Sequence, residues 1–138
     1  MPPLYLVFAK PAVEVLEVDI YGAFNGRPRN GLHVDHMPSQ AAIRRYIENN
    51  VPDATSDEIL NNVASIAVPA RVHQRYSETY GGRNTRQKQL LDAGDLRVAV
   101  NSNFDFIKPH LLEEGFSENT LESARAKLHK INEQQGWY

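Results

Sequence analysis

The sequence predicts an α+β fold, and three of its features support this class. Segments rich in β-branched residues at 4–9, 13–21, 32–36 and 63–68 indicate strands in the first half of the chain. Apolar residues at helical spacing dominate the second half. Strands and long helices are thus largely segregated rather than strictly alternating, which is typical of α+β domains.

Residues 1–30 are expected to contribute N-terminal strands. The segments 4–9 and 13–21 could pair as a hairpin, and the Gly, Asn and Pro-rich stretch 22–31 predicts a loop. "LHVDH" (32–36) alternates apolar and polar residues as a short strand does. Ser39 can then cap a helix that reaches Asn50.

The next elements are a strand followed by a short helix. Pro52 ends the preceding helix, a short turn is expected at 57–61, and "VASIAV" (63–68) indicates the strand. Pro69 suits the first position of a helix that carries His73. "YGGRN" (80–84) interrupts this helix.

The remaining residues, 85–138, predict a helical part. Asn84 or Thr85 can cap one long helix that runs toward His110, with Gly94 and Pro109 as its weak points. Ser117 begins the last helix, whose apolar stripe indicates a core-facing side and consists of Leu121, Ala124, Leu128 and Ile131.

Composition favours one compact domain spanning 1–138. Hydrophobic residues make up 41% of the 138 residues, and no apolar run has the ~18 residues of a membrane span. The start lacks the basic region and cleavage site of a signal peptide. Cysteine is absent, so any metal site must use His, Asp, Glu or Asn ligands.

Charge alone argues against nucleic-acid binding, since the net charge is −2. Its distribution is more informative. Residues 71–88 hold five basic residues against the single acid Glu78, whereas 92–138 are acidic on balance. The basic stretch is either a phosphate-facing surface or an ordinary solvated helix face.

"GLHVDHMP" (31–38) places His33, Asp35 and His36 within four positions. This is either a histidine-rich turn or half of a metal site. His73, about one turn into the helix that follows the next strand, supplies a second half. On strict alternation His33 shares a face with Asp35, and we expect it to be either a third ligand or a surface histidine.

These pieces resemble the HNH, or His-Me finger, endonucleases, whose metal finger is a β-hairpin followed by a helix (ββα-metal). The resemblance implies that His36 is the general base, that Asp35 and His73 bind the metal, and that Asn62 lies near the second strand. The chain departs from the simplest pattern because a helix at 39–50 is inserted between the two strands. The finger would then span residues 31–84.

A second resemblance covers residues 31–138. "HMPSQAAI", "VPARVHQ", "TYGGRNT" and "NEQQGWY" are similar to C-terminal toxin domains of bacterial polymorphic secreted effectors, of the Rhs and contact-dependent kind. It implies a domain of a larger secreted effector, delivered by the producing bacterium to act in the target-cell cytoplasm. A dedicated immunity protein would be its partner, and no membrane association is expected.

The chemistry of phosphodiester hydrolysis suits these residues. Neutral His36, with an ordinary pKa of ~6.5, can accept the proton of the attacking water. Asp35 and the imidazoles suit Mg²⁺ first, with Mn²⁺, Ni²⁺ or Zn²⁺ as alternatives. Asn62 could orient His36, and Arg83 could clamp phosphate with its planar fork, while Arg71 or Arg75 could follow the backbone.

One geometric condition applies to this site. Adjacent strand residues point to opposite faces, so Asp35 and His36 converge only if the chain bends near Met37-Pro38.

We therefore expect a metal-dependent endonuclease toxin of interbacterial competition that acts on DNA. Two alternatives remain open. One is an RNase or another metal-dependent hydrolase toxin. The other is a non-enzymatic protein-binding domain whose histidines are structural.

Overall fold

The computed structural model of the chain describes residues 10–51 and 56–138. Three strands form one sheet: β1 (Val18–Ile20), β2 (Leu32–His36) and β3 (Ala64–Pro69). The helices are α2 (Gln40–Asn50), α3 (Ser56–Leu60), α4 (Ala70–Tyr76), α5 (Arg86–Gly94), α6 (Leu96–Glu113) and α7 (Glu118–Gln134). Two 3-10 turns, η1 (Tyr21–Phe24) and η2 (Gly81–Arg83), complete the elements. The α+β class is confirmed.

The sheet is antiparallel with the order β1-β3-β2. β3 is its central strand, and its residues are almost all buried because both faces are covered. Directly opposite residues of an antiparallel pair lie on the same face. The register therefore places Asp35 with Ile66 and His33 with Val68 on one face, and Val34 with Ala67 on the other.

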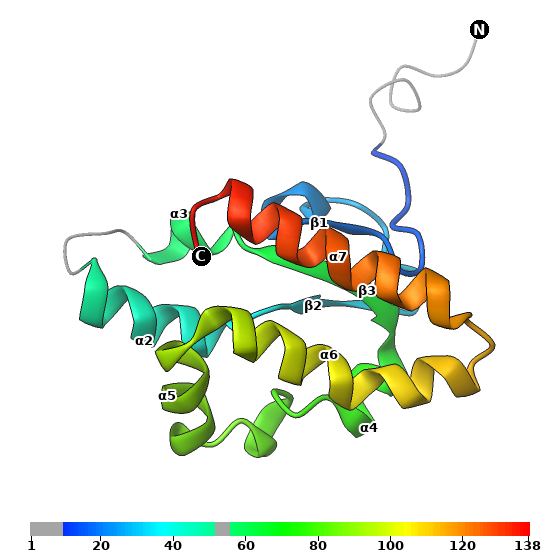
Figure 1. The fold of residues 1–138 in the computed structure, drawn as a ribbon. Coiled ribbons are helices and arrows are strands. Elements are labelled where there is room, and N and C mark those ends of the chain that lie inside the picture. Colours follow the sequence, from blue (N-terminus) through cyan, green and yellow to red (C-terminus); the bar gives the residue numbers. More distant parts are fainter. Residues whose placement is uncertain (1–9, 52–55) are drawn as a thin grey trace, which may run out of the picture.

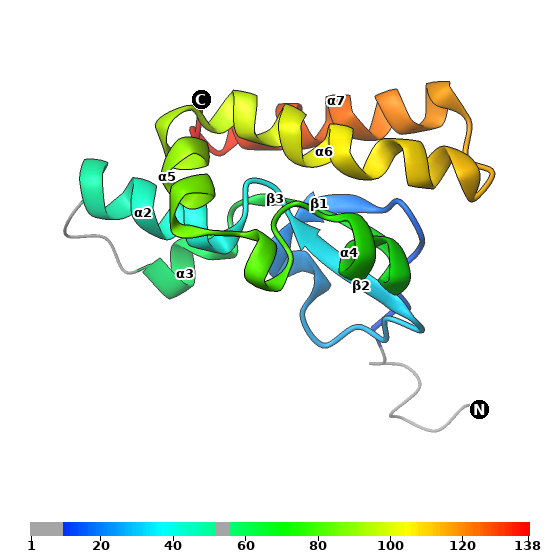
Figure 2. The ribbon, with the colours of Figure 1, turned by 90° about the horizontal axis from the view of Figure 1, so that it is seen from below.

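Helices cover one face of this sheet. α6 and α7 lie side by side, and α4 crosses near β2 (Figures 1 and 2). Ile66 and Val68 pack there against apolar side chains of α4, α6 and α7. The other face is covered by η1 and the segment before β1, where Phe24 and Val13 pack on Val34 and Ala67.

A second apolar cluster lies between α2, α3 and the start of α6. It contains Ile43, Ile47, Leu60, Val63 and Leu96. Ser39 caps α2, because its hydroxyl accepts a hydrogen bond from the amide of Ala42 at 3.1 Å. This cluster holds the helices inserted between β2 and β3 against the body of the domain.

Two predicted elements differ from the structure. Of the segment 13–21, only Val18–Ile20 is a strand, because the chain turns before it. Leu16 has a φ of 64°, and the amide of Glu17 donates a hydrogen bond to the Glu14 carbonyl.

The single helix expected from 85 toward His110 is two helices, α5 and α6. Asp95 separates them, because its side chain caps α6 by accepting from the Val98 amide. The segment 4–9 lies outside the described residues.

The strand, strand, helix order of the predicted metal finger is present. β2 and β3 pair antiparallel, α4 follows β3 directly, and α2 and α3 are inserted between the strands. The identity of this unit as a metal finger stays a prediction. Among the described helices, none combines the length and apolar character that a bilayer-spanning helix requires.

Asn132 of α7 joins the ends of β2 and β3. Its side-chain oxygen accepts from the Ala64 amide at 2.9 Å, and its nitrogen donates to the Met37 carbonyl at 3.0 Å and to the Tyr138 hydroxyl at 3.2 Å. The side chain is fully buried. Two backbone groups at the sheet end therefore depend on one amide.

Asn132→Leu is expected to destabilise the fold by about 2–4 kcal/mol, because it leaves a buried N–H and a buried C=O without partners. Urea unfolding followed by circular dichroism measures the change. Lys130→Ala, an exposed change on the same helix, should shift stability by less than ~0.5 kcal/mol. Equal stability of the two variants would contradict the assigned role.

Candidate active site

A pocket of ≈220 Å³ opens beside the end of β2. Its walls come from β2, the first turn of α2, α4 and the loop between α4 and α5. The lining residues are Val34, Asp35, His36, Ser39, Gln40, Ala41, His73, Thr79 and Asn84. The N–H groups in the first turn of a helix have no intrahelical acceptors, so the α2 end of this wall favours anions.

Asp35 is the central acidic group of the pocket. Its register opposite Ile66 puts it on the helix-covered face, where only 2% of the residue is exposed. Its Oδ2 has no hydrogen-bond partner. Burial, with a smaller contribution from the charge of Glu78, raises the pKa of Asp35 to about 7. The carboxyl therefore needs either a proton or a cation near neutral pH.

His73 lies next to this carboxyl and is paired with His33. The Nδ1 atoms of the two rings are 2.9 Å apart, and His73 Nε2 is 3.8 Å from Asp35 Oδ1. One Nδ1 donates and the other accepts. Burial lowers the pKa of His73 to about 4, with smaller contributions from His33 and Arg83. His73 is thus neutral at physiological pH.

His36 lies on the opposite face of β2. Its Nδ1 is 2.5 Å from the Pro38 carbonyl oxygen, its Nε2 is 2.9 Å from that of Leu60, and Tyr21 contacts its ring edge. Burial lowers the pKa of His36 although the two carbonyls oppose this shift. The Met37-Pro38 peptide that follows it is cis. His36 also lines the pocket, but its ring nitrogens lie against the two carbonyls and not against Asp35 or His73.

Asn62 and Arg83 do not line the pocket that contains Asp35, although the charge of Arg83 acts on His73. Asn62 is exposed, and its carbonyl accepts from the indole of Trp137. Arg83 donates to the carbonyls of Ser77 at 2.8 Å and Gln74 at 2.6 Å, so it caps the end of α4. The structure therefore brings together His33, Asp35 and His73, and the roles expected for His36, Asn62 and Arg83 stay predictions.

Among the described residues, no group of three His, Asp or Glu side chains is arranged to hold a metal ion. His73 turns Nδ1 to His33 and Nε2 to Asp35. Asp35 and His73 Nε2 form a two-donor edge with an unpartnered oxygen, and Mg²⁺ commonly binds one or two protein groups while keeping waters.

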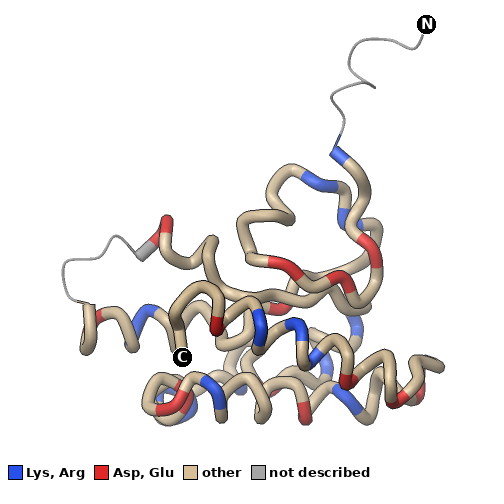
Figure 3. Tube along the Cα trace, turned by 45° about the horizontal axis from the view of Figure 1, so that its top comes forward, with Lys and Arg blue, Asp and Glu red and all other residues tan. Residues whose placement is uncertain are grey.

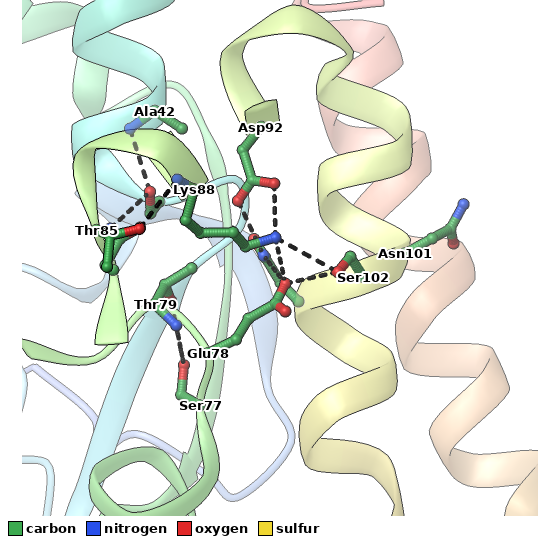
Figure 4. Close-up of polar contacts among 12 residues, drawn as sticks. Ala42, Ser77, Glu78, Thr79, Thr85, Lys88, Asp92, Asn101 and Ser102 are labelled. Carbon is green, nitrogen blue, oxygen red and sulfur yellow. Dashed lines mark hydrogen bonds and ion pairs between the residues drawn. The ribbon is translucent and has the colours of Figure 1, made fainter. Parts of the chain in front are cut away.

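A charged network behind the pocket was not predicted from the sequence. Lys88 Nζ lies 2.8 Å from Glu78 and 2.7 Å from Asp92, and Ser102 donates to Glu78 at 2.7 Å (Figure 4). Asn103 also donates to Glu78, at 2.8 Å. The network ties the loop after α4 to α5 and α6, and so fixes the pocket wall that contains Thr79. The i,i+4 spacing of Lys88 and Asp92 was its one local signal.

The chain was compared with known proteins. No protein-family model matches it, and no solved structure does. It is similar to Deoxyribonuclease CdiA of Dickeya dadantii (strain 3937), with 34% identity over 131 residues. The chain is a relative of a CdiA segment. The match covers 91% of this chain but only 4% of the length of CdiA. The resemblance to toxin domains of polymorphic effectors is thereby confirmed.

Asp35→Asn is expected to change stability in a pH-dependent way. Below about pH 4 the carboxyl is protonated in the folded and unfolded chains, so its ionisation has no influence there. Because its folded pKa is raised to about 7, the wild type loses stability as pH rises from 4 to 7, and Asp35→Asn lacks this loss.

Denaturation in EDTA at pH 4 and pH 8 measures this effect. The stability of Asp35→Asn relative to wild type should rise between the two pH values by an amount on the order of 2–4 kcal/mol. Glu113→Gln, with a side chain 75% exposed, is the control and should show little pH dependence. A constant difference for Asp35→Asn would mean that the protein already compensates this charge.

Lys88→Met is expected to destabilise the fold by about 2–4 kcal/mol, because Glu78 and Asp92 would face each other without a cation. Adding Glu78→Gln should recover part of the loss, and a double-mutant cycle by urea unfolding measures the coupling. Strictly additive effects would contradict a network. Lys130→Met is the exposed control.

Proposed function

We propose that this domain is a metal-dependent deoxyribonuclease toxin of bacterial competition. Two observations support it. The relative with 34% identity is a deoxyribonuclease. The described residues also place Asp35 and His73 beside a pocket, with a buried carboxylate oxygen that has no partner. The proposed metal dependence rests on the second observation.

Asp35 and His73 would hold the ion, with Mg²⁺ the first choice and Mn²⁺, Ni²⁺ or Zn²⁺ as alternatives. A divalent ion there would supply Lewis-acid stabilisation of the phosphodiester charge. His73 is neutral at pH 7, and its Nδ1–H tautomer, which donates to His33, would offer a lone pair at Nε2. The ionised form of Asp35 would be favoured by the ion, which offsets the cost of burying that charge.

His33 acts as the positioning residue of this arrangement rather than as a third ligand. Its Nδ1 engages Nδ1 of His73, which orients the ring and leaves Nε2 toward Asp35. Histidine ligands commonly use their second nitrogen in this way. His33 is partly exposed at the mouth of the same face.

The predicted general base, His36, has weaker geometric support. Both of its ring nitrogens lie within hydrogen-bond distance of backbone carbonyls. The neutral ring donates to one of them, and its other nitrogen would have to turn away from the second carbonyl to accept a proton from water. A structural contribution at the end of β2 is better supported, since His36 joins Pro38 to the end of α3.

The biological setting follows from the relationship to an effector. The chain spans 4% of the length of its CdiA relative, and we propose that it is likewise part of a larger effector. Its site of action would be DNA in the cytoplasm of the target cell, and a cognate immunity protein would protect the producer.

Purified protein with Mg²⁺ or Mn²⁺ is expected to nick and linearise plasmid DNA, and EDTA should stop it. His73→Ala should lower the cleavage rate by at least about 100-fold, because one of two ligands is lost. Gel analysis of plasmid and total RNA in parallel separates the substrates. The control is Lys130→Ala, which should cut at the wild-type rate.

The proposal predicts that plasmid remains intact with His73→Ala at a protein concentration that degrades it with wild type. Preferential loss of RNA would favour the RNase alternative. Intact nucleic acid with every metal, while the wild type still inhibits growth when produced inside cells, would overturn the nuclease assignment.

His36→Asn is expected to lower stability by about 1–3 kcal/mol, because a buried carbonyl loses the N–H donor of the imidazole. Cleavage at 10 °C per folded molecule should stay within about tenfold of wild type, which separates a structural role from a base. A properly folded His36→Asn without activity would instead restore His36 as the general base.

A further inference from the structure

A second hollow lies next to the candidate active site along α2. Its volume is ≈200 Å³, and it is lined by Ala41, Arg44, Arg45, Glu48 and Gln89. Ala41 also lines the pocket that contains Asp35 and His73. The two hollows therefore adjoin at Ala41. Arg44 and Arg45 stand about one helical turn, or ~5.4 Å, farther along α2.

Arg45 is held in a fixed relation to the first pocket. Its Nε donates to the side-chain oxygen of Gln89 at 2.9 Å, and the Gln89 amide nitrogen donates to the Asn84 carbonyl at 2.8 Å. Asn84 lines the first pocket. This chain of bonds orients the guanidinium through a neutral partner, so the Gln89 bond does not neutralise its charge.

Arg44 and Arg45 line the second hollow together with Glu48, and Arg44 also pairs with Asp57 at 3.0 Å. The side chain of Asp57 is 84% exposed, and such surface pairs contribute little to stability. Figure 3 shows the basic stretch of α2 in blue, with an acidic position in red nearer the C-terminal end of the helix.

The arginines suggested by the sequence are used elsewhere. Arg71 forms a two-pronged contact with Glu114, and Arg83 donates to carbonyls at the end of α4. Neither lines the Asp35–His73 pocket or the second hollow, whereas Arg44 and Arg45 of α2 line the second hollow.

We propose that Arg44 and Arg45 bind the sugar-phosphate backbone of DNA next to the phosphodiester in the Asp35–His73 pocket. This inference rests on the proposed function and names the surface that the substrate follows. The planar guanidinium matches phosphate oxygens in a two-bond fork. Contacts to phosphates also release counterions, so they add affinity that depends on salt but not on base sequence.

The placement has a mechanistic consequence. A strand seated on the second hollow is led toward Ala41 and the first turn of α2, and from there into the pocket. α2 is the helix inserted between β2 and β3, so the insertion that separates the two strands would serve as the substrate-binding element.

Fluorescence anisotropy with a labelled 20-base-pair duplex in EDTA tests the proposal without cleavage. Arg45→Gln should weaken binding roughly three- to tenfold at low salt, and the slope of log Kd against log salt should fall by about 1. Adding Arg44→Gln should lower both further. Lys130→Gln removes an exposed charge on α7 and is expected to have a much smaller effect.

Binding and salt slope unchanged in the Arg44→Gln/Arg45→Gln variant would overturn the proposal, as would an equal loss in Lys130→Gln. Thermal melting of each variant confirms that the domain is folded before binding is compared. Because binding is measured without metal, failure of this surface is distinct from failure of the nuclease assignment, which the plasmid assay reports.

Discussion

The register of β2 against β3 is the constraint on which the candidate site depends. Pairing with Ile66 turns Asp35 toward the face that α4, α6 and α7 cover. A slip by one residue would move Asp35 to the opposite face and replace it with His36 or Val34. Asn132 secures this register, since it binds Met37 just after β2 and Ala64 at the start of β3.

Burial of Asp35 makes ionisation of its carboxyl unfavourable, and the neighbouring groups do not offset this cost. Lys88 is committed to Glu78 and Asp92, and His73 is neutral at pH 7. An ionised Asp35 would therefore lack a paired charge among these groups. This is the physical reason for placing a divalent ion there: the ion, unlike a proton, keeps the carboxylate charged and available.

Strand alternation and helix capping were enough to predict part of the site. Alternation put His33 and Asp35 on one face, and the helix begun after Pro69 brought His73 to them. The same alternation indicated that Asp35 and His36 point to opposite faces, and the bend proposed to bring them together comes only after His36.

Local patterns could not reveal the contact of Lys88 with Glu78 or that of Arg45 with Gln89, because these contacts depend on how α5 packs against distant segments. The sequence pattern predicts Gly94 only as a weak point of one helix, and the break at Asp95 follows from the cap that this side chain makes on α6.

The central claim is that Asp35 and His73 bind a divalent ion through the edge at Nε2. A crystal of the protein soaked in Mn²⁺ and measured for anomalous scattering tests it most directly. The account predicts a peak ~2.0–2.4 Å from an Asp35 carboxylate oxygen and from His73 Nε2, with the His33–His73 contact retained. A Mn²⁺ peak elsewhere in the domain, with none at this edge, would contradict it.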